Sequence, residues 1–253
     1  MLLALLPIPG HEIRSQNCMR RYLGVGVFVA VRFVGPALLF SAVAVAARAQ
    51  NPSESDALVQ LLALCAVARV AAPLASDQFI LANYDAEASP KAILVRDTKA
   101  ISFINLTFVV TGISLYLLPI PRGMQSTATV MYLWGSSGLI GMASAALRVC
   151  GYKIRSSVAE SIALPSALLL LLLSGSEPRI CVAFAVAAAT LTSGWFVLQK
   201  SRSEFKPAAV PRAFTFRDYL PGNSANFSVV FAVKAPVIGL ASIAGTGAST
   251  ALD

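Results

Sequence analysis

The stretch VGVFVAVRFVGPALLFSAVAVAA, residues 25–47, is apolar over a length that can cross a bilayer, yet it carries Arg32 near its middle. A helix needs about 20 mostly apolar residues to span the hydrocarbon region. A second apolar stretch, SVVFAVKAPVIGLASIAG (228–245), carries Lys234 in a similar place. A cation at the centre of a membrane costs about 2.5–3.5 kcal/mol. These two residues, together with Arg69, therefore require a physical explanation.

The composition is that of an integral membrane protein. The chain has 253 residues, of which 57% are hydrophobic and 13% charged, and its mean hydropathy is +0.72. A soluble domain carries about 25% charged residues. The net charge of +8 is explained by membrane-flanking loops, so nucleic acid is not predicted as a partner. The four cysteines show no CxxC spacing and the only histidine is His11, so we predict no metal site, disulfide framework or cofactor.

Seven apolar segments predict an all-α, polytopic transmembrane helix bundle. They cover 22–47, 57–81, 100–120, 126–148, 157–174, 178–198 and 222–245. The first six form an N-terminal lobe at 22–198, preceded by a cytoplasmic segment at 1–21 whose start is Met1 or Met19. A basic cytoplasmic linker at 199–221 leads to 222–253, which we interpret as the first helix of a truncated second lobe.

The positive charges predict the orientation. With the N-terminus inside, 14 of the 20 Lys and Arg residues fall in inner segments, three in outer loops and three within spans. Cytoplasmic loops of membrane proteins carry an excess of Lys and Arg. Connections rich and poor in Lys and Arg alternate along all seven segments, as inner and outer loops should. This alternation favours a cytoplasmic N-terminus in a multi-pass protein.

The three charges within spans are predicted to lie at similar depth. A rise of about 1.5 Å per residue puts Arg32, Arg69 and Lys234 about 15–18 Å from the inner face. On this scale Asp77 lies about 12 Å closer to the cytoplasm than Arg69. Glu160 is near the inner end of its span. We therefore expect no carboxylate at the depth of these cations. They predict a water-filled cavity with a positive wall for an anion, and the alternative is structural ion pairs with a buried acid.

A proline follows each of these cations, and two of the charged segments resemble each other. Pro36, Pro73 and Pro236 permit kinks, which are tolerated where a helix lines protein or a cavity. FVAVR (28–32) is echoed by VFAVK (230–234). Many transporters consist of two related halves with the substrate site between them. The echo favours such an architecture.

Three longer segments carry a resemblance to a known family. They are GPALLFSAVAVAARAQNPSESDALVQLLALCAVARVAAPLASDQFIL (35–81), ALRVCGYKIRSSVAESIALPSALLLLLL (146–173) and RDYLPGNSANFSVVFAVKAPVIGLASIAGTGAS (217–249). Together they resemble the N-terminal half of the polysaccharide repeat-unit (O-antigen-type) flippases of the multidrug/oligosaccharidyl-lipid/polysaccharide exporter superfamily. The likeness extends over nearly all of the chain from about residue 20.

This resemblance implies a transporter of the bacterial inner membrane that moves undecaprenyl-pyrophosphate-linked oligosaccharides for surface polysaccharide biosynthesis. It implies that Arg32 and Arg69 bind an anionic lipid-linked glycan, and that Lys234 joins this substrate site when a second lobe closes over it. Membrane lipids are expected partners, and a second chain would supply the missing lobe because the family has two lobes. Asp77 is the candidate for binding a coupling ion.

Other classes of protein require residues that can be compared with this sequence. A multidrug cation antiporter of the same superfamily needs buried acids, of which Asp77 is the only candidate, and an inactive fragment or scaffold protein is a further alternative. A microbial rhodopsin with Lys234 as its Schiff base would need a buried carboxylate counter-ion, which the segment 100–120 lacks. An enzyme is not predicted, because no nucleophile is paired with a base and no metal-ligand spacing is present.

Overall fold

The computed structural model describes residues 10–49, 52–84, 88–118, 122–200, 224–225 and 227–234. Across these ranges the chain is helical and contains no strand, which confirms the all-α class. The elements, in chain order, are α1 (Gly10–Ala49), α2 (Pro52–Ala71), α3 (Ser76–Asn83), α4 (Pro90–Ala92), η1 (Ile93–Asp97), α5 (Lys99–Leu117), α6 (Arg122–Val149), α7 (Lys153–Ser157), η2 (Val158–Ile162), α8 (Ala163–Leu173) and α9 (Pro178–Lys200). The η elements are π-helical, and residues 224–225 and 227–234 are also helical.

Five helical segments are long and apolar enough to cross a membrane. They are Val29–Arg48, Lys99–Leu117, Gln125–Val149, Lys153–Leu173 and Pro178–Gln199, and the bent pair α2–α3 makes a sixth if it counts as one span. These six correspond to the first six predicted segments. The total of seven is not confirmed, because most of the seventh segment, 222–245, lies outside the described residues.

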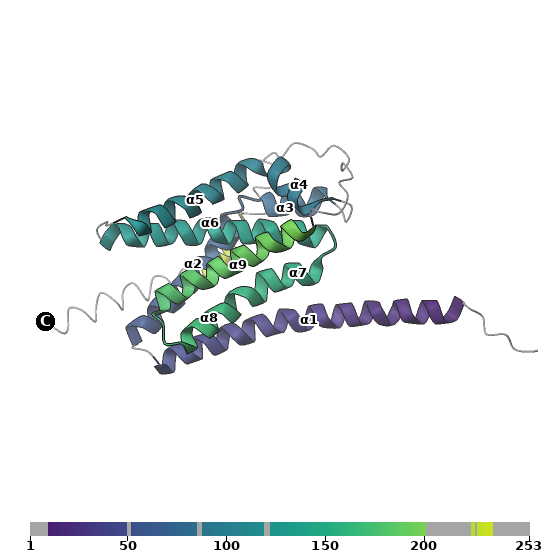
Figure 1. Ribbon diagram of the computed structural model, residues 1–253, viewed down its shortest axis with the longest axis horizontal. Helices are drawn as coiled ribbons and strands as arrows, with labels where there is room; N and C mark the ends of the chain where they lie inside the picture. Colours follow the sequence, from purple (N-terminus) through teal and green to yellow (C-terminus); the bar gives the residue numbers. More distant parts are fainter. Residues whose placement is uncertain are drawn as a thin grey trace, which may run out of the picture.

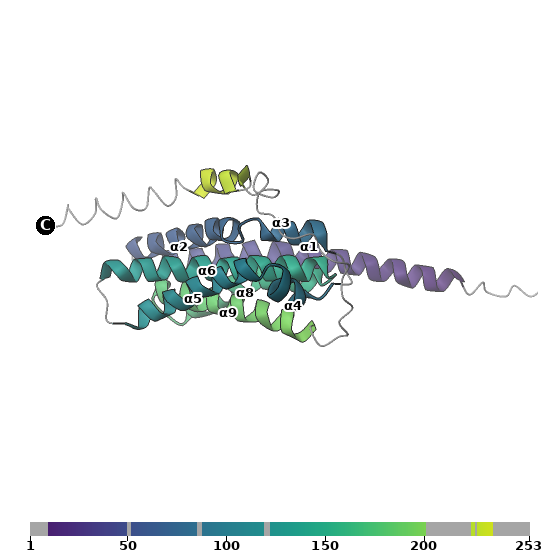
Figure 2. The ribbon, with the colours of Figure 1, turned by 90° about the horizontal axis from the view of Figure 1, so that it is seen from above.

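The helices form a bundle with α1 along one edge and α5 along the opposite edge. Figure 1 shows α6 beside α5, α9 in the middle, and α7 and α8 between α9 and α1. The view from above shows α2 and α3 lying along the bundle as well (Figure 2). The N-terminal part of α1 extends past the other helices in both views. Among the described residues, the outer faces of α1 and α5 have no protein neighbours.

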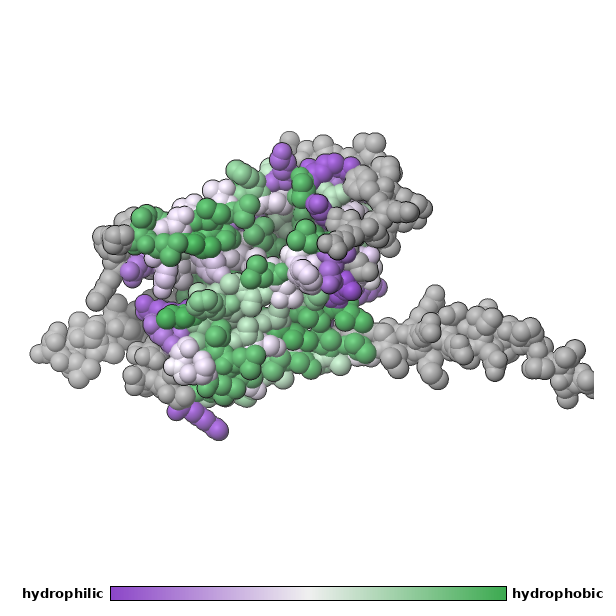
Figure 3. Space-filling view, in the orientation of Figure 1, coloured by the Kyte–Doolittle hydropathy of each residue, from purple (hydrophilic) through white to green (hydrophobic). Residues whose placement is uncertain are grey.

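The outer surface of the bundle is apolar. Green, hydrophobic side chains cover much of the face over α1 and α5 in Figure 3. Large exposed apolar side chains on these two helices include Phe33, Phe40, Phe103, Tyr116 and Leu117. A soluble protein rarely exposes contiguous apolar surface of this extent. The length and apolar composition of the helices are those of a membrane-embedded protein.

The second predicted segment is a broken helix rather than a straight one. α2 and α3 meet at an angle of 49° across the turn 72–75. Pro73 lies in this turn, and Leu74 and Ala75 have φ values of 48° and 64°. Proline cannot donate the backbone hydrogen bond that would continue the helix. α2 ends two residues after Arg69, so that this side chain projects from the last turn of α2.

A second irregularity lies between α7 and α8. The N–H of Ala163 donates to the carbonyl of Val158, an i→i−5 bond that defines the π-helical η2. Pro165 has no N–H to offer the carbonyl of Ser161, four residues earlier. α1 approaches this carbonyl at Gly35, where a Cβ would lie only 2.2 Å from the Ser161 oxygen. Glycine is therefore required for α1 to pack against η2.

Replacing Gly35 with alanine is expected to destabilise the protein by about 1–3 kcal/mol through overpacking. Gly26→Ala on the same helix is the matched control, because a Cβ there meets nothing within 4 Å. Thermal unfolding in detergent micelles measures the difference between the two variants. Equal midpoints for Gly35→Ala and Gly26→Ala would contradict the close contact between α1 and η2.

Candidate functional site

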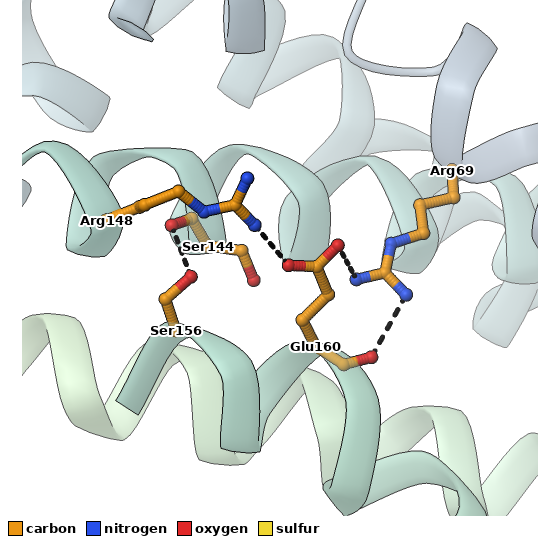
Figure 4. Close-up of polar contacts among 5 residues, drawn as sticks. All are labelled: Arg69, Ser144, Arg148, Ser156 and Glu160. Carbon is orange, nitrogen blue, oxygen red and sulfur yellow. Dashed lines mark hydrogen bonds and ion pairs between the residues drawn. The ribbon is translucent and has the colours of Figure 1, made fainter. Parts of the chain in front are cut away.

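Arg69 reaches from the end of α2 to Glu160 on η2. Its Nη2 lies 2.9 Å from Glu160 Oε1, and its Nη1 donates a hydrogen bond of 3.0 Å to the Glu160 backbone carbonyl. Figure 4 shows both contacts. Arg69 thus binds the side chain and the main chain of one residue at once. It joins the broken α2–α3 segment to the π-helical segment of another span.

Arg148 binds the other oxygen of the same carboxylate. Its Nη2 contacts Glu160 Oε2 from the last turn of α6. In Figure 4 the Glu160 carboxylate lies between the two guanidinium groups. One turn earlier on α6, the Ser144 carbonyl accepts a 2.9 Å hydrogen bond from Ser156 Oγ, which ties α7 to α6 beside the ion pairs. Glu160 is therefore the centre of an Arg–Glu–Arg bridge between three spans.

Arg32 adds a third positive charge near this bridge. It lies one turn before Gly35 on α1, on the side of that helix that packs against η2. Its side chain is exposed, and its charge acts repulsively on both Arg69 and Arg148. We call Arg32, Arg69 and Arg148, gathered around Glu160, the arginine cluster.

Asp77 contributes a second negative charge. It lies in the first turn of α3 and attracts Arg148 electrostatically. With Glu160 it sets two negative charges against the three positive charges of the arginine cluster. Counted over these five described residues alone, the net charge is +1.

The surroundings of Glu160 also hold unused hydrogen-bond donors. Arg148 Nε, Ser144 Oγ and Ser157 Oγ are buried and have no hydrogen-bond partner among the described residues. Asp77 Oδ1, an acceptor, is likewise buried and has no hydrogen-bond partner among the described residues. Buried polar atoms are normally satisfied by protein, water or a ligand. These donors could be satisfied by an acceptor such as water or an oxyanion.

The expectation that Arg69 has no carboxylate at its depth is wrong, because Glu160 binds it directly. The depth estimate assumed a straight helix to residue 81, whereas the chain breaks after α2. It also placed Glu160 at the inner end of a span beginning at 157. The span begins at Lys153, which puts Glu160 about 10 Å along it. The depth of these residues in a bilayer stays a prediction.

The structure brings together only part of the predicted substrate site. Arg69 is at its centre, and Arg32 and Asp77 lie within electrostatic range of Arg148. Lys234 ends the helical stretch 227–234 and is partly exposed. Among the described residues, no ion pair joins Lys234 to Glu160 or Asp77. A role of Lys234 in substrate binding stays a prediction.

Two residues, one in the site and one beside it, were not predicted from the sequence. Arg148 was counted among the inner loop charges because it ends a predicted span, yet α6 continues past it. Asn105, a polar residue in the middle of α5, is buried, and its Nδ2 donates 3.1 Å hydrogen bonds to the carbonyls of Ala72 and Ile101. It thereby satisfies a carbonyl in the turn that follows Arg69. The presence of a single asparagine within an apolar span could have indicated this buried, hydrogen-bonding role.

The geometry suits recognition of an anion more than other kinds of chemistry. Across the described ranges, no group of three or more His, Cys, Asp or Glu residues could hold a metal ion. The chain matches no protein-family model, no curated protein and no solved structure.

Proposed function

We propose that this chain is a membrane transporter whose arginine cluster binds the phosphate groups of an anionic, lipid-linked substrate. The observation that supports it is that two guanidinium groups from different spans share one carboxylate, while Arg32 adds a third positive charge. Undecaprenyl-pyrophosphate-linked oligosaccharides, the substrates of the family that the sequence resembles, belong to this chemical class. The proposal follows from charge and donor geometry together with that resemblance.

Arginine suits such a substrate for a physical reason. Its planar guanidinium donates two parallel hydrogen bonds to a phosphate, and it stays charged in any environment. Inside a membrane protein the effective dielectric is low, so each contact to an anion is stronger than at a water-exposed surface. Arg69 and Arg148 approach Glu160 from different helices, and a phosphate bound in its place would connect the same helices.

A multidrug cation antiporter is less consistent with this site. Such a transporter needs an acid that is available to a cation or a proton. Glu160 is held by two arginines, and Asp77 lies in the field of Arg148. The surplus positive charge would repel a cationic drug. We therefore favour an anionic substrate over a cationic one.

The proposal includes a bacterial inner membrane location with the N-terminus in the cytoplasm. Its basis is the excess of Lys and Arg in the segments assigned to the inside. Labelling of single cysteines with a membrane-impermeant reagent in intact cells tests the orientation. Ser176→Cys, between α8 and α9, should be labelled from outside, and Ser203→Cys should not. The reverse pattern would contradict the orientation.

Reconstitution into liposomes tests transport. The purified chain should accelerate movement of a fluorescent polyprenyl-pyrophosphate oligosaccharide between leaflets, relative to protein-free liposomes. It should not accelerate the same fluorescent polyprenol without phosphate. Equal rates with and without protein would contradict transport by this chain and favour a scaffold role. Transport of a cationic dye, without transport of the polyprenyl-pyrophosphate oligosaccharide, would favour the antiporter.

A further inference from the structure

The Glu160 carboxylate occupies the position that a bound phosphate would take. Each of its oxygens contacts a different guanidinium, Arg69 on one side and Arg148 on the other. While this carboxylate lies between the two guanidiniums, a substrate anion cannot take its place at the Nη2 atoms of Arg69 and Arg148 (Figure 4). The internal anion and an external one are therefore mutually exclusive at this site.

We propose that Glu160 is a built-in counter-anion that the substrate displaces, and that it thereby selects for anions with charge on several oxygens. The inference rests on the proposed function, because it assumes that the arginine cluster binds substrate. It assigns Glu160 a role that the sequence did not predict, as the residue that sets which anions can enter.

Selectivity follows from the exchange of one anion for another. A monocarboxylate entering the site would replace the contacts of Glu160 one for one and gain little. A pyrophosphate group has more acceptor oxygens than a carboxylate, so it can contact both guanidiniums and also accept from a donor that Glu160 leaves unused, Arg148 Nε. Charge-assisted hydrogen bonds are worth about twice a neutral one. A multivalent phosphate therefore gains contacts on exchange.

The location of Glu160 allows it to leave. Its side chain is 26% exposed, so that a change of rotamer can bring the released carboxylate to water. Its backbone lies in η2, and single π-helical turns within α-helices occur frequently at functional sites. The Arg69 bond to the Glu160 carbonyl does not involve the carboxylate, so it can hold the backbone while the side chain moves.

The test is the affinity of the purified full chain for inorganic pyrophosphate, measured by calorimetry in a neutral detergent. Glu160→Gln keeps the shape of the side chain and removes its charge, so the variant should bind pyrophosphate tighter than wild type by about tenfold or more. Glu177→Gln is the matched control, because it removes the same charge from an exposed residue outside the site. Its affinity should equal that of the wild type.

The outcomes separate this inference from the proposed function. If wild type binds pyrophosphate and Glu160→Gln binds it equally or more weakly, the counter-anion role is wrong but the anion site stands. An equal gain in Glu177→Gln would also overturn the role, since the effect would then be one of total charge. If neither wild type nor Glu160→Gln binds, both proposals fail.

Folding of the variant is checked by size-exclusion chromatography. If Glu160→Gln does not fold, Glu160→Asp takes its place, because its shorter side chain keeps the charge but reaches the two guanidiniums less well. It should also bind pyrophosphate more tightly than wild type. An equal or weaker affinity in the variant that folds would overturn the inference.

Discussion

Glu160→Ala is expected to lower the free energy of unfolding by about 1–3 kcal/mol, because it removes the shared partner of two partly buried arginines. The variant leaves Arg69 and Arg148 facing each other across the space that the carboxylate filled. Arg32 adds to their repulsion. The bridge between α2, α6 and η2 would be lost at the same time. Unfolding by SDS in mixed micelles measures the change.

Glu177→Ala controls for the loss of one negative charge and should leave the stability near that of the wild type. Arg69→Ala combined with Glu160→Ala provides a second check, because the double variant removes both members of one pair. Its loss should be clearly smaller than the sum of the two single losses. Additive losses, or a Glu160→Ala variant as stable as Glu177→Ala, would mean that the bridge does not stabilise the fold.

Arg69→Ala/Arg148→Ala is expected to slow transport of the polyprenyl-pyrophosphate substrate in liposomes by about 100-fold or more. Each arginine would contribute at least one charge-assisted hydrogen bond to the phosphate, worth about 1.5–3 kcal/mol. Two such losses correspond to a factor of about 100 or more, since 1.4 kcal/mol is tenfold. Replacing both arginines leaves Arg32 as the remaining cation of the arginine cluster.

Arg179→Ala is the control for this variant, because Arg179 is an exposed arginine at the start of α9, outside the site. It should transport at the wild-type rate. Arg69→Lys should be intermediate, because lysine keeps the charge but lacks the planar fork that contacts the Glu160 carboxylate and carbonyl together. Transport by the double variant at the rate of Arg179→Ala would exclude a role for the arginines in substrate binding.

Much of the fold could be predicted from hydropathy alone. A spanning helix satisfies its own backbone hydrogen bonds, so an apolar stretch of sufficient length has few other choices in lipid. For this reason the segments from 22–47 to 178–198 correspond to helices of the structure. The break at Pro73 was signalled only as a permitted kink. Its 49° bend depends on tertiary contacts, including Asn105 from another span, which a local pattern does not contain.

The sequence indicated Arg69 but not the residues around it. An arginine within an apolar span indicates a functional or paired charge, and Arg69 is paired with Glu160. Its partner could not be identified because depth was counted along straight helices, whereas a π-helical turn and a bend bring Glu160 to Arg69. Arg148 was not predicted to belong to the site, because the rule that cytoplasmic loops are rich in Lys and Arg assigns a cation at the end of a span to the loop.

Native mass spectrometry of the detergent-solubilised chain tests the central claim most directly. The protein is mixed with equal amounts of undecaprenyl pyrophosphate and undecaprenol, two lipids that share a tail and differ only in the phosphate groups. We predict that wild type and Arg179→Ala retain the pyrophosphate lipid in preference to the alcohol, and that Arg69→Ala/Arg148→Ala loses this preference. Equal retention of both lipids by the wild type, or an unchanged preference in the double variant, would contradict an anion site at the arginine cluster.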